Sequence, residues 1–291
     1  MDWLDYWDVD KSASCLLSIC LGGSIPTSRP RRSLRSPRKL RTPVKRPTQK
    51  AAGGAYVGCS GWAYPSWKPG FYPASVSSKK FLEHYATRLN SVEVNYTFRS
   101  LPSRATVDGW LAQTGDGFRF SFKAPQRITH IRRLKECGPA LAEFAEAIGP
   151  VAEAGRMGLV LVQLAPNMKA DTERLEAFLA DAKPLGLRLA FEFRHASWFD
   201  AATYRLLEAH TAALCVAESD ELETPDVATA PFACYRLRKS EYTKARLREI
   251  AELLTRRAEC GEVFAYFKHE DQPTGALRAA AVLEQMRGRA A

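Results

Sequence analysis

Short apolar runs alternate with amphipathic stretches along the chain from residue 55 onward. The apolar runs have the length of strands buried on both faces, and they lie near residues 56–60, 91–95, 118–123, 158–164, 187–193, 213–217, 232–237 and 262–267. The stretches between them have helical spacing near residues 78–89, 103–113, 136–153, 171–183, 200–210, 241–259 and 275–287. This alternation predicts parallel strands joined by crossover helices.

The number of predicted strands favours one fold class. Eight strands in about 240 residues predict an α/β fold, a (β/α)₈ TIM barrel in a single domain. The N-caps that we expect for its helices include Ser77, Ser103, Asp171 and Ser240, and helices should end at Gly186 and Gly261. An open doubly wound sheet is the alternative. No G-x-G-x-x-G or G-x-x-x-x-G-K-[ST] motif follows a predicted strand, so nucleotide binding of those two kinds has no support.

The basic charge of the chain belongs mainly to its N-terminal part. Residues 1–52 hold eleven Lys or Arg and four Asp, whereas the other 239 residues hold 31 basic and 28 acidic side chains. Residues 26–50 combine Pro and Ser with ten basic residues and no acid, a composition that cannot bury a core. We therefore expect a disordered basic extension over residues 1–54 and the barrel domain over residues 55–291.

The sequence also bounds the location of the protein. No run of eighteen apolar residues is present, so no membrane span is predicted. The short apolar run after residue 12 is preceded by Asp2, Asp5, Asp8 and Asp10, which is the wrong charge for a secretory leader. The seven cysteines include no C-x-x-C pair, which argues against a disulfide framework or a structural zinc site. We expect a reduced, cytoplasmic protein with no membrane partner.

Polar side chains gather at the C-terminal ends of the predicted strands, where a TIM barrel carries its active site. In chain order they are Ser60, Trp62, Tyr64, Glu93, Asn95, Lys123, Gln163, Glu192, Arg194, His195, Glu218, Asp220, Arg236, Arg238, Lys268 and His269. Alternate residues of a strand share a face, so Glu192 and Arg194 can both point into the barrel mouth. We therefore expect a functional pocket there. For any single Glu–Arg pair at the mouth, the alternative is a structural ion pair in which each side chain only balances the charge of the other.

Five segments at these strand ends carry a specific pattern. They are GCSGWAYPSW (58–67), NSVEVNYTF (90–98), FRFSFKAP (118–125), VQLAP (162–166) and FEFRHASW (191–198). Together they resemble the signature blocks of the YecE-like family (domain of unknown function 72), over roughly residues 55–285. The resemblance implies a TIM barrel and a pocket at the strand ends, and it implies no particular reaction. Two later segments depart from the family pattern by adding the cations Arg238 and Lys268.

The charges expected at the mouth favour an anionic ligand. The candidate cations are Lys123, Arg194, Arg236, Arg238 and Lys268, and the candidate acids are Glu93, Glu192 and Glu218. Guanidinium and ammonium groups suit phosphate or carboxylate. The sequence therefore predicts a small anionic substrate that contains phosphate or is sugar-like.

Other chemistries fit the same residues less well. Glu93 and Glu192 could form the acid–base pair of a glycosidase, but nearby cations would lower both carboxyl pKa values and weaken the acid. A metal site could draw on Glu93, Glu192, His195, Glu218, Asp220 and His269. The absence of H-x-H or H-E-x-x-H spacing argues against zinc and leaves Mg²⁺ or Mn²⁺ open. No metal ligand is assigned.

These observations give one main hypothesis and one alternative. The main hypothesis is an enzyme, a hydrolase or isomerase of the TIM-barrel type, with Glu192 as general base or metal ligand, Glu93 as second carboxylate and His195 as proton carrier. The predicted substrate-binding residues are Lys123, Arg194, Arg236 and Lys268 for the anion, Asn95 and Gln163 for hydroxyls, and Trp62 and Tyr64. Each of the two aromatic residues could stack on a sugar or base, or else cap the core as we expect of Trp67 and Phe199. The alternative function is a non-catalytic nucleic-acid-binding module that uses the barrel mouth and the basic tail.

Overall fold

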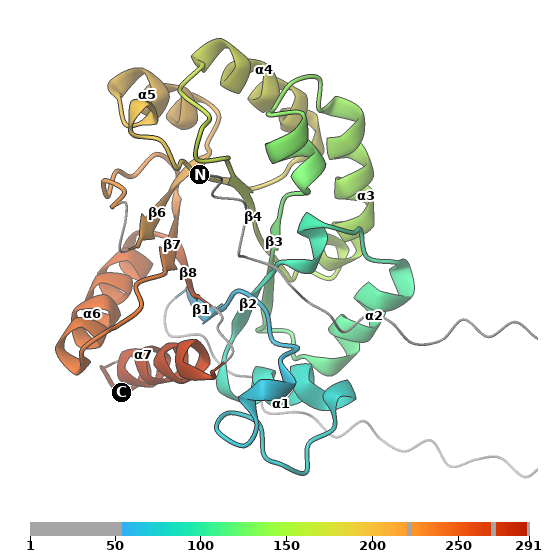
Figure 1. The fold of residues 1–291 in the computed structure, drawn as a ribbon, viewed down its shortest axis with the longest axis vertical. Helices are drawn as coiled ribbons and strands as arrows, with labels where there is room; N and C mark the ends of the chain where they lie inside the picture. Colours follow the sequence, from blue (N-terminus) through green and yellow to red (C-terminus); the bar gives the residue numbers. More distant parts are fainter. Residues whose placement is uncertain (1–53, 220–222, 269–271, 290–291) are drawn as a thin grey trace, which may run out of the picture. The chain divides into compact units, whose positions relative to one another are not determined.

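Eight parallel strands form the centre of the molecule. The computed structural model describes residues 54–219, 223–268 and 272–289. Its strands are β1 (Ala55–Cys59), β2 (Ser91–Val94), β3 (Arg119–Lys123), β4 (Met157–Gln163), β5 (Leu189–Glu192), β6 (Ala213–Glu218), β7 (Phe232–Leu237) and β8 (Glu262–Phe267). They pair in the order β1-β8-β7-β6-β5-β4-β3-β2 and curl into a nearly closed barrel (Figure 1). The predicted (β/α)₈ fold class is confirmed.

Helices surround this barrel. They are α1 (Phe81–Arg88), α2 (Arg104–Gln113), α3 (Gly138–Glu153), α4 (Thr172–Ala182), α5 (Ala201–Ala209), α6 (Lys244–Cys260) and α7 (Thr274–Arg289). Helix α1 starts later than predicted because a 3₁₀ turn, Ser78–Lys80, follows Ser77. No helix described for the chain has both the length and the apolar character that crossing a membrane requires.

Two of the four predicted N-caps act as caps, and Ser77, which precedes the 3₁₀ turn, makes no capping hydrogen bond with its side chain. Ser103 and Asp171 each accept a hydrogen bond from the backbone N–H three residues later, at 3.2 and 3.0 Å, as predicted. The prediction for Ser240 is wrong, because α6 begins after Thr243. The Thr243 hydroxyl accepts from the Arg246 N–H at 3.1 Å and so satisfies a group that Ser240 is too far along the chain to reach.

The two predicted stop glycines act for different reasons. Gly186 has a φ of 63°, a left-handed conformation that disfavours residues with a Cβ atom. Gly261 follows α6 in an extended conformation, and a Cβ atom there would collide with the carbonyl oxygen of Pro231. Both positions confirm the predicted helix ends.

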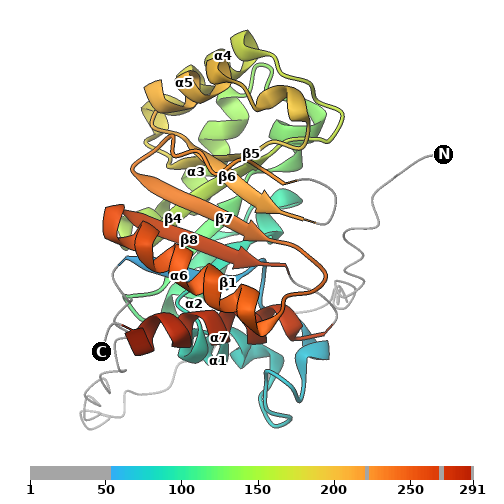
Figure 2. The same ribbon diagram turned by 90° about the vertical axis from the view of Figure 1, so that its left-hand side faces the viewer.

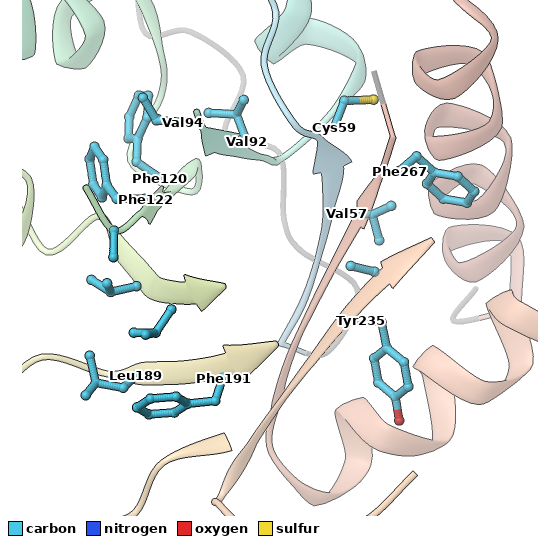
Figure 3. Packing of buried hydrophobic residues seen from close by; sticks show 14 of the residues in the cluster. Val57, Cys59, Val92, Val94, Phe120, Phe122, Leu189, Phe191, Tyr235 and Phe267 are labelled. Carbon is cyan, nitrogen blue, oxygen red and sulfur yellow. The ribbon is translucent and has the colours of Figure 1, made fainter. Parts of the chain in front are cut away.

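Apolar side chains leave the strands on both sides of the barrel wall. Val57, Phe120 and Phe191 belong to a large buried cluster between strands and helices, and Figure 3 shows Tyr235 and Phe267 pointing from their strands toward neighbouring helices. A second buried cluster fills the barrel interior: Tyr56, Leu159, Leu161, Ala190, Ala213, Cys215, Phe232, Cys234, Phe264 and Tyr266. The middle of the barrel is therefore filled with apolar side chains. Polar side chains can gather at the end of the barrel where the strands have their C-termini, which we call its upper end or mouth.

A side chain closes the barrel at the seam between β1 and β2. The backbones of these two strands form no ladder in the described barrel. Instead, the side-chain amide of Asn90 hydrogen-bonds to the β1 backbone as a neighbouring strand would. Its Oδ1 accepts from the Val57 N–H at 2.8 Å, and its Nδ2 donates to the Ala55 carbonyl at 2.8 Å. The buried amide thus satisfies backbone groups that would otherwise be unpaired.

Tyr85 extends the same seam toward the mouth. Its hydroxyl accepts from the Cys59 N–H at 2.7 Å and donates to the Ser91 carbonyl at 2.9 Å. The chains approach so closely here that a Cβ atom at position 58 would collide with the Ser91 carbonyl oxygen, which explains Gly58. The seam therefore fixes β1 against β2 without a backbone ladder.

The connection between β6 and β7 differs from the others. Its described residues, 219 and 223–231, contain no helix. In Figure 2 the outer faces of β6 and β7 lie open between α5 and α6. Residues 1–53, which make up nearly all of the predicted extension, lie outside the described residues.

Candidate functional site

The strand pattern carries polar side chains into the upper end of the barrel. In three strands, a residue of the apolar interior is followed two positions later by a buried polar residue: Leu161 by Gln163, Ala190 by Glu192, and Cys234 by Arg236. Residues two apart in a strand point the same way, so each polar side chain continues an interior row. Glu93 joins them from β2 and is fully buried.

Arg236 is the centre of this layer. Its Nε and Nη2 donate to the two carboxylate oxygens of Glu93 at 3.0 and 2.6 Å, and its Nη1 donates to Glu192 at 2.5 Å. Burial alone would lower the pKa of Arg236, but the two carboxylates outweigh it and raise that pKa. The guanidinium therefore holds β2, β5 and β7 together. We call Glu93, Glu192 and Arg236 the ionic layer.

Glu192 has no free oxygen in this arrangement. Its second oxygen accepts from Gln163 Nε2 at 2.8 Å and from Arg194 Nε at 3.1 Å. Burial alone would raise the pKa of its carboxyl, but Arg236, Arg194 and Arg238 hold that pKa well below its usual range. A carboxylate so firmly ionised is a poor proton acceptor, so the geometry favours a positioning role for it.

A hydroxyl network lies beneath the ionic layer. The Tyr266 hydroxyl donates to Ser121 Oγ at 2.6 Å and lies 2.8 Å from Ser91 Oγ. Ser121 Oγ also accepts from the Leu159 N–H at 3.0 Å. All three hydroxyl-bearing residues are buried, so this network closes the floor of the site and limits a ligand to the mouth.

Lys123 extends from the end of β3 into the mouth and is only partly buried. Its Nζ lies 3.9 Å from the centre of the Phe98 ring, and within the described part of the chain it forms no ion pair with a carboxylate. Burial and the neighbouring Arg236 lower the pKa of Lys123 to about 8, although Glu93 and Glu192 act against them. The carboxylates cannot pair with it because Arg236 already occupies them.

Arg238 is the second cation of this kind. It lies one residue after the end of β7 and two after Arg236. Its backbone N–H still donates to the Glu218 carbonyl at 2.8 Å, so strand alternation gives both side chains the same orientation. Burial and the like charge of Arg236 lower the pKa of Arg238 to about 10, and its guanidinium makes no ion pair among the residues described. Lys123 and Arg238 thus bring positive charge to the mouth that the described protein does not neutralise. We call them the rim cations.

Asn95 stands beside the ionic layer. Its Nδ2 donates to the Ser60 carbonyl at 3.2 Å, and its Oδ1 is buried without a hydrogen-bond partner among the described residues. An unpaired buried acceptor is unfavourable, and a hydroxyl of a bound molecule could satisfy it.

The other predicted site residues have different surroundings. His195 Nδ1 accepts from the Ser197 N–H at 3.2 Å and so caps the 3₁₀ turn Ala196–Trp198. The Trp62 ring packs edge-on against Trp110, with 5.7 Å between ring centres.

Two more predicted site residues lie near the same end of the barrel. The Tyr64 ring is 4.8 Å from the ring of Trp67, which is fully buried in the core as expected. Lys268 directly follows β8, and its backbone N–H donates to the Leu237 carbonyl at 3.0 Å.

The expectation that Glu218 faces the barrel mouth is wrong. Strand alternation places Ala213 and Cys215 in the interior, so Glu218 points outward. There it accepts from Arg246 Nη2 at 3.2 Å and pairs with Lys239 at 3.0 Å. Glu218 and Arg246 border a cavity of about 450 Å³ outside the barrel, between β6, β7 and α6.

The metal alternative has few candidate ligands left. Asp220 and His269 lie outside the described residues, and the carboxylate oxygens of Glu93 and Glu192 are hydrogen-bonded to protein groups. In the described ranges, no group of three His, Cys, Asp or Glu side chains gathers as metal ligands would.

Two residues of this site were listed among the polar strand ends but were given no role in the main hypothesis. Ser60 Oγ donates to Glu93 at 2.8 Å, and Arg236 Nη2 reaches the same hydroxyl at 3.4 Å. Arg238 carried a usable signal, its i+2 spacing from Arg236. Ser60 carried a weaker one, because it directly follows a buried strand.

Comparison with known proteins gives a consistent result. The family described as "Protein of unknown function DUF72" matches residues 56–291. The chain is 34% identical over 145 residues to "UPF0759 protein YecE" of Escherichia coli, and 27% identical over 155 residues to "UPF0759 protein YunF" of Bacillus subtilis. These alignments cover 50% and 51% of this chain and 50% and 54% of those proteins. The chain thus aligns with about half the length of the curated relatives that it matches.

Solved structures show the same fold. A DUF72 family protein from Thermotoga maritima is similar with a TM-score of 0.69 and 24% identity, over 81% of this chain and 98% of that one. A DUF72 family protein from Enterococcus faecalis is similar with a TM-score of 0.63 and 16% identity, over 81% and 96%. At these identities the likeness is one of fold.

Proposed function

The chain belongs to the DUF72 family of unknown function, and from the geometry of its barrel mouth we propose that it is an enzyme acting on a small anionic substrate. The substrate contains phosphate or carboxylate and is sugar-like. It binds against the rim cations, with Arg194 beside them. Asn95 Oδ1, which lacks a partner in the described structure, accepts a substrate hydroxyl.

One observation carries this proposal. Lys123 and Arg238 are both partly buried, both have lowered pKa values and both lack an acidic partner in the described structure. Two like charges held close together out of bulk water are unfavourable unless something neutralises them. A bound anion supplies that charge and accepts hydrogen bonds from the guanidinium and ammonium groups.

The ionic layer supports this clamp rather than contacting the anion. Glu93 and Glu192 are saturated by Arg236, so their negative charge is offset where it would otherwise repel the ligand. Arg194, 34% of whose side chain is exposed, is bound to Glu192 through Nε only, which leaves its other donors available among the described contacts. The described cysteines are free thiols, which supports a reducing, cytoplasmic setting for the enzyme.

The test is a thermal-shift titration of the full chain with inorganic phosphate, sulfate and simple sugar phosphates. A ligand at ten times its Kd stabilises the native state by about 1.4 kcal/mol, a shift of roughly 3–6 °C for a domain of this size. We expect Arg238→Met to abolish the shift. The matched control is Arg257→Met, which removes an arginine paired with Asp226 on the outer face.

Two results would contradict the proposal. One is that no small anion raises the melting temperature. The other is that the Arg238→Met and Arg257→Met variants respond equally. The same titration is repeated with short DNA and RNA at several salt concentrations, using the full chain and a chain that lacks residues 1–52. Steeply salt-dependent binding that needs those residues would favour the nucleic-acid-binding module instead.

A further inference from the structure

We propose that Lys123 is a nucleophile that forms an imine with the carbonyl carbon of the anionic substrate, an inference that rests on the proposed function. It names a chemical class for the substrate: an aldehyde or ketone that also carries a phosphate or carboxylate. The rim cation Arg238 and the neighbouring Arg194 hold the anionic group, and the Lys123 amine meets the carbonyl.

The surroundings of Lys123 favour this role over that of a second anion clamp alone. An acidic partner favours the protonated form of a lysine. Lys123 has no such partner in the described structure, because the nearby carboxylates Glu93 and Glu192 are bound to Arg236. Its amine is therefore the one that can be neutral near physiological pH and attack an electrophile.

Position supports the same conclusion. Lys123 is the last residue of β3, so its backbone is fixed by the strand, and the Thr97 hydroxyl also donates to its carbonyl at 2.7 Å. The Phe98 ring, 3.9 Å from Nζ, holds the amine over one face of the mouth. A nucleophile on a strand end with a fixed side chain needs little reorganisation to reach a bound carbonyl.

The chemistry balances without a further reactant. The lysine ammonium loses a proton, its nitrogen lone pair attacks the carbonyl carbon, and the carbonyl oxygen leaves as water after two protons are added to it. The net change converts an ammonium and a carbonyl into a protonated imine and one water, and the charge is unchanged. The positive charge of the imine then lies beside the substrate's own anionic group.

The groups that surround the amine set its pH dependence. They are Glu93 on β2, Glu192 at the end of β5 with Arg194 two residues after it, Arg236 on β7 with Arg238 two residues after it, and His130, whose ring packs against Phe98 with 5.1 Å between centres. Arg236 and Arg238 favour the neutral amine, and the two carboxylates oppose them. Burial decides the direction, and the pKa of Lys123 falls to about 8.

The experiment uses pyridoxal 5′-phosphate, an aldehyde with a phosphate group, followed by borohydride reduction and peptide mass spectrometry of the full chain. We expect modification of Lys123 at concentrations that leave Lys239 and the exposed Lys79 unmodified, with half-maximal labelling near pH 8. Pyridoxal, which lacks the phosphate, should label Lys123 roughly tenfold less, because a charged hydrogen bond is lost. Arg238→Met should reduce labelling by the phosphate form to a similar extent.

Lys123→Arg separates this inference from the proposed function, because it keeps a cation and cannot form an imine. We expect it to retain the thermal shift with inorganic phosphate and to lose the reduced adduct. If the wild-type chain shows the phosphate shift but Lys123 is labelled no more than Lys79, the imine is wrong and the anion site stands. If neither the shift nor the label appears, both proposals fail.

Discussion

Two charged clusters lie on opposite faces of β7, and they differ in how their charges are balanced. On the outer face, Arg257 pairs with Asp226 at 2.7 Å, and Arg246 and Lys239 share Glu218. Each of these cations has an acidic partner. On the inner face, four cations surround two carboxylates, and the rim cations have no acidic partner in the described structure.

The comparison shows that cavity size does not locate the site. The outer face borders a cavity of about 450 Å³, but its charges are already satisfied by one another. The inner face has a surplus of positive charge at the end of the barrel where this fold carries its chemistry. A surplus held in a partly buried place indicates a missing partner, which is why we assign the ligand to the mouth.

The largest difference between the clusters should appear when a central arginine is removed. Arg236→Met leaves two buried carboxylates unpaired and should lower the free energy of unfolding by about 3–5 kcal/mol. Arg257→Met removes a partly exposed pair and should lower it by about 1 kcal/mol or less. Urea denaturation of both variants measures the two losses. Equal losses would mean that the inner layer is no more tightly coupled than a surface pair.

The seam between β1 and β2 supports the inner cluster alone, because Ser60 directly follows β1 and Glu93 lies on β2. Asn90→Ala leaves the Val57 N–H and the Ala55 carbonyl without their partners and should cost about 2–4 kcal/mol of unfolding free energy. We expect hydrogen exchange to accelerate in β1 and β2 and to stay unchanged in β6 and β7. Uniform acceleration in all strands would show that the seam has no local role.

The sequence pattern predicted the barrel because buried parallel strands are short apolar runs, and each of the eight lies within two residues of its predicted bounds. It also predicted the inward side chains Glu93, Gln163 and Arg236, since strand alternation is strict. It could not predict the seam. Asn90 appears in the sequence as an ordinary polar residue before a strand, and only the closing of the barrel brings it beside Val57.

The direction of Glu218 could not be predicted either. The end of an apolar run does not show which of two successive residues points inward, and a shift of one residue reverses the face. Likewise, the surroundings of Glu192 depend on Arg236, 44 residues away, which binds its carboxylate and helps to hold its pKa well below the usual range. Strand alternation predicts which face of the sheet a side chain lies on. The residue that it contacts there depends on the tertiary structure.

Mutation of a rim cation and of an outer-face cation should change the free energy of unfolding in opposite directions. Arg238→Met removes a repulsive neighbour of Arg236 and should raise the free energy of unfolding by about 0.5–1 kcal/mol while binding of phosphate is lost, a trade of stability for function. Arg246→Met, on the outer face, should lower stability slightly. Calorimetry of both variants without ligand gives the two signs. A loss of stability in the Arg238→Met variant would show that this arginine is structural.

The last expected effect is a slope with pH rather than a single gain or loss, and Lys123 contributes it. Its pKa is about 8 in the folded chain, below its ordinary value of 10.5, so between these values the unfolded chain binds more protons than the folded one. The free energy of unfolding should therefore rise with pH from about 8 to 10.5, relative to that of Lys123→Met. Well below pH 8, at about pH 6 and lower, the difference between the two proteins should be constant, because Lys123 is then protonated in both states. The outer Lys239 is the matched control. Lys239 has the acidic partner that Lys123 lacks in the described structure, at 3.0 Å from Glu218, so Lys239→Met tests whether the rise belongs to the mouth. Parallel pH profiles for the wild type and Lys123→Met would mean that the mouth holds this lysine as an ordinary surface cation, and the contrast between the two faces of β7 would then rest on Arg238 alone.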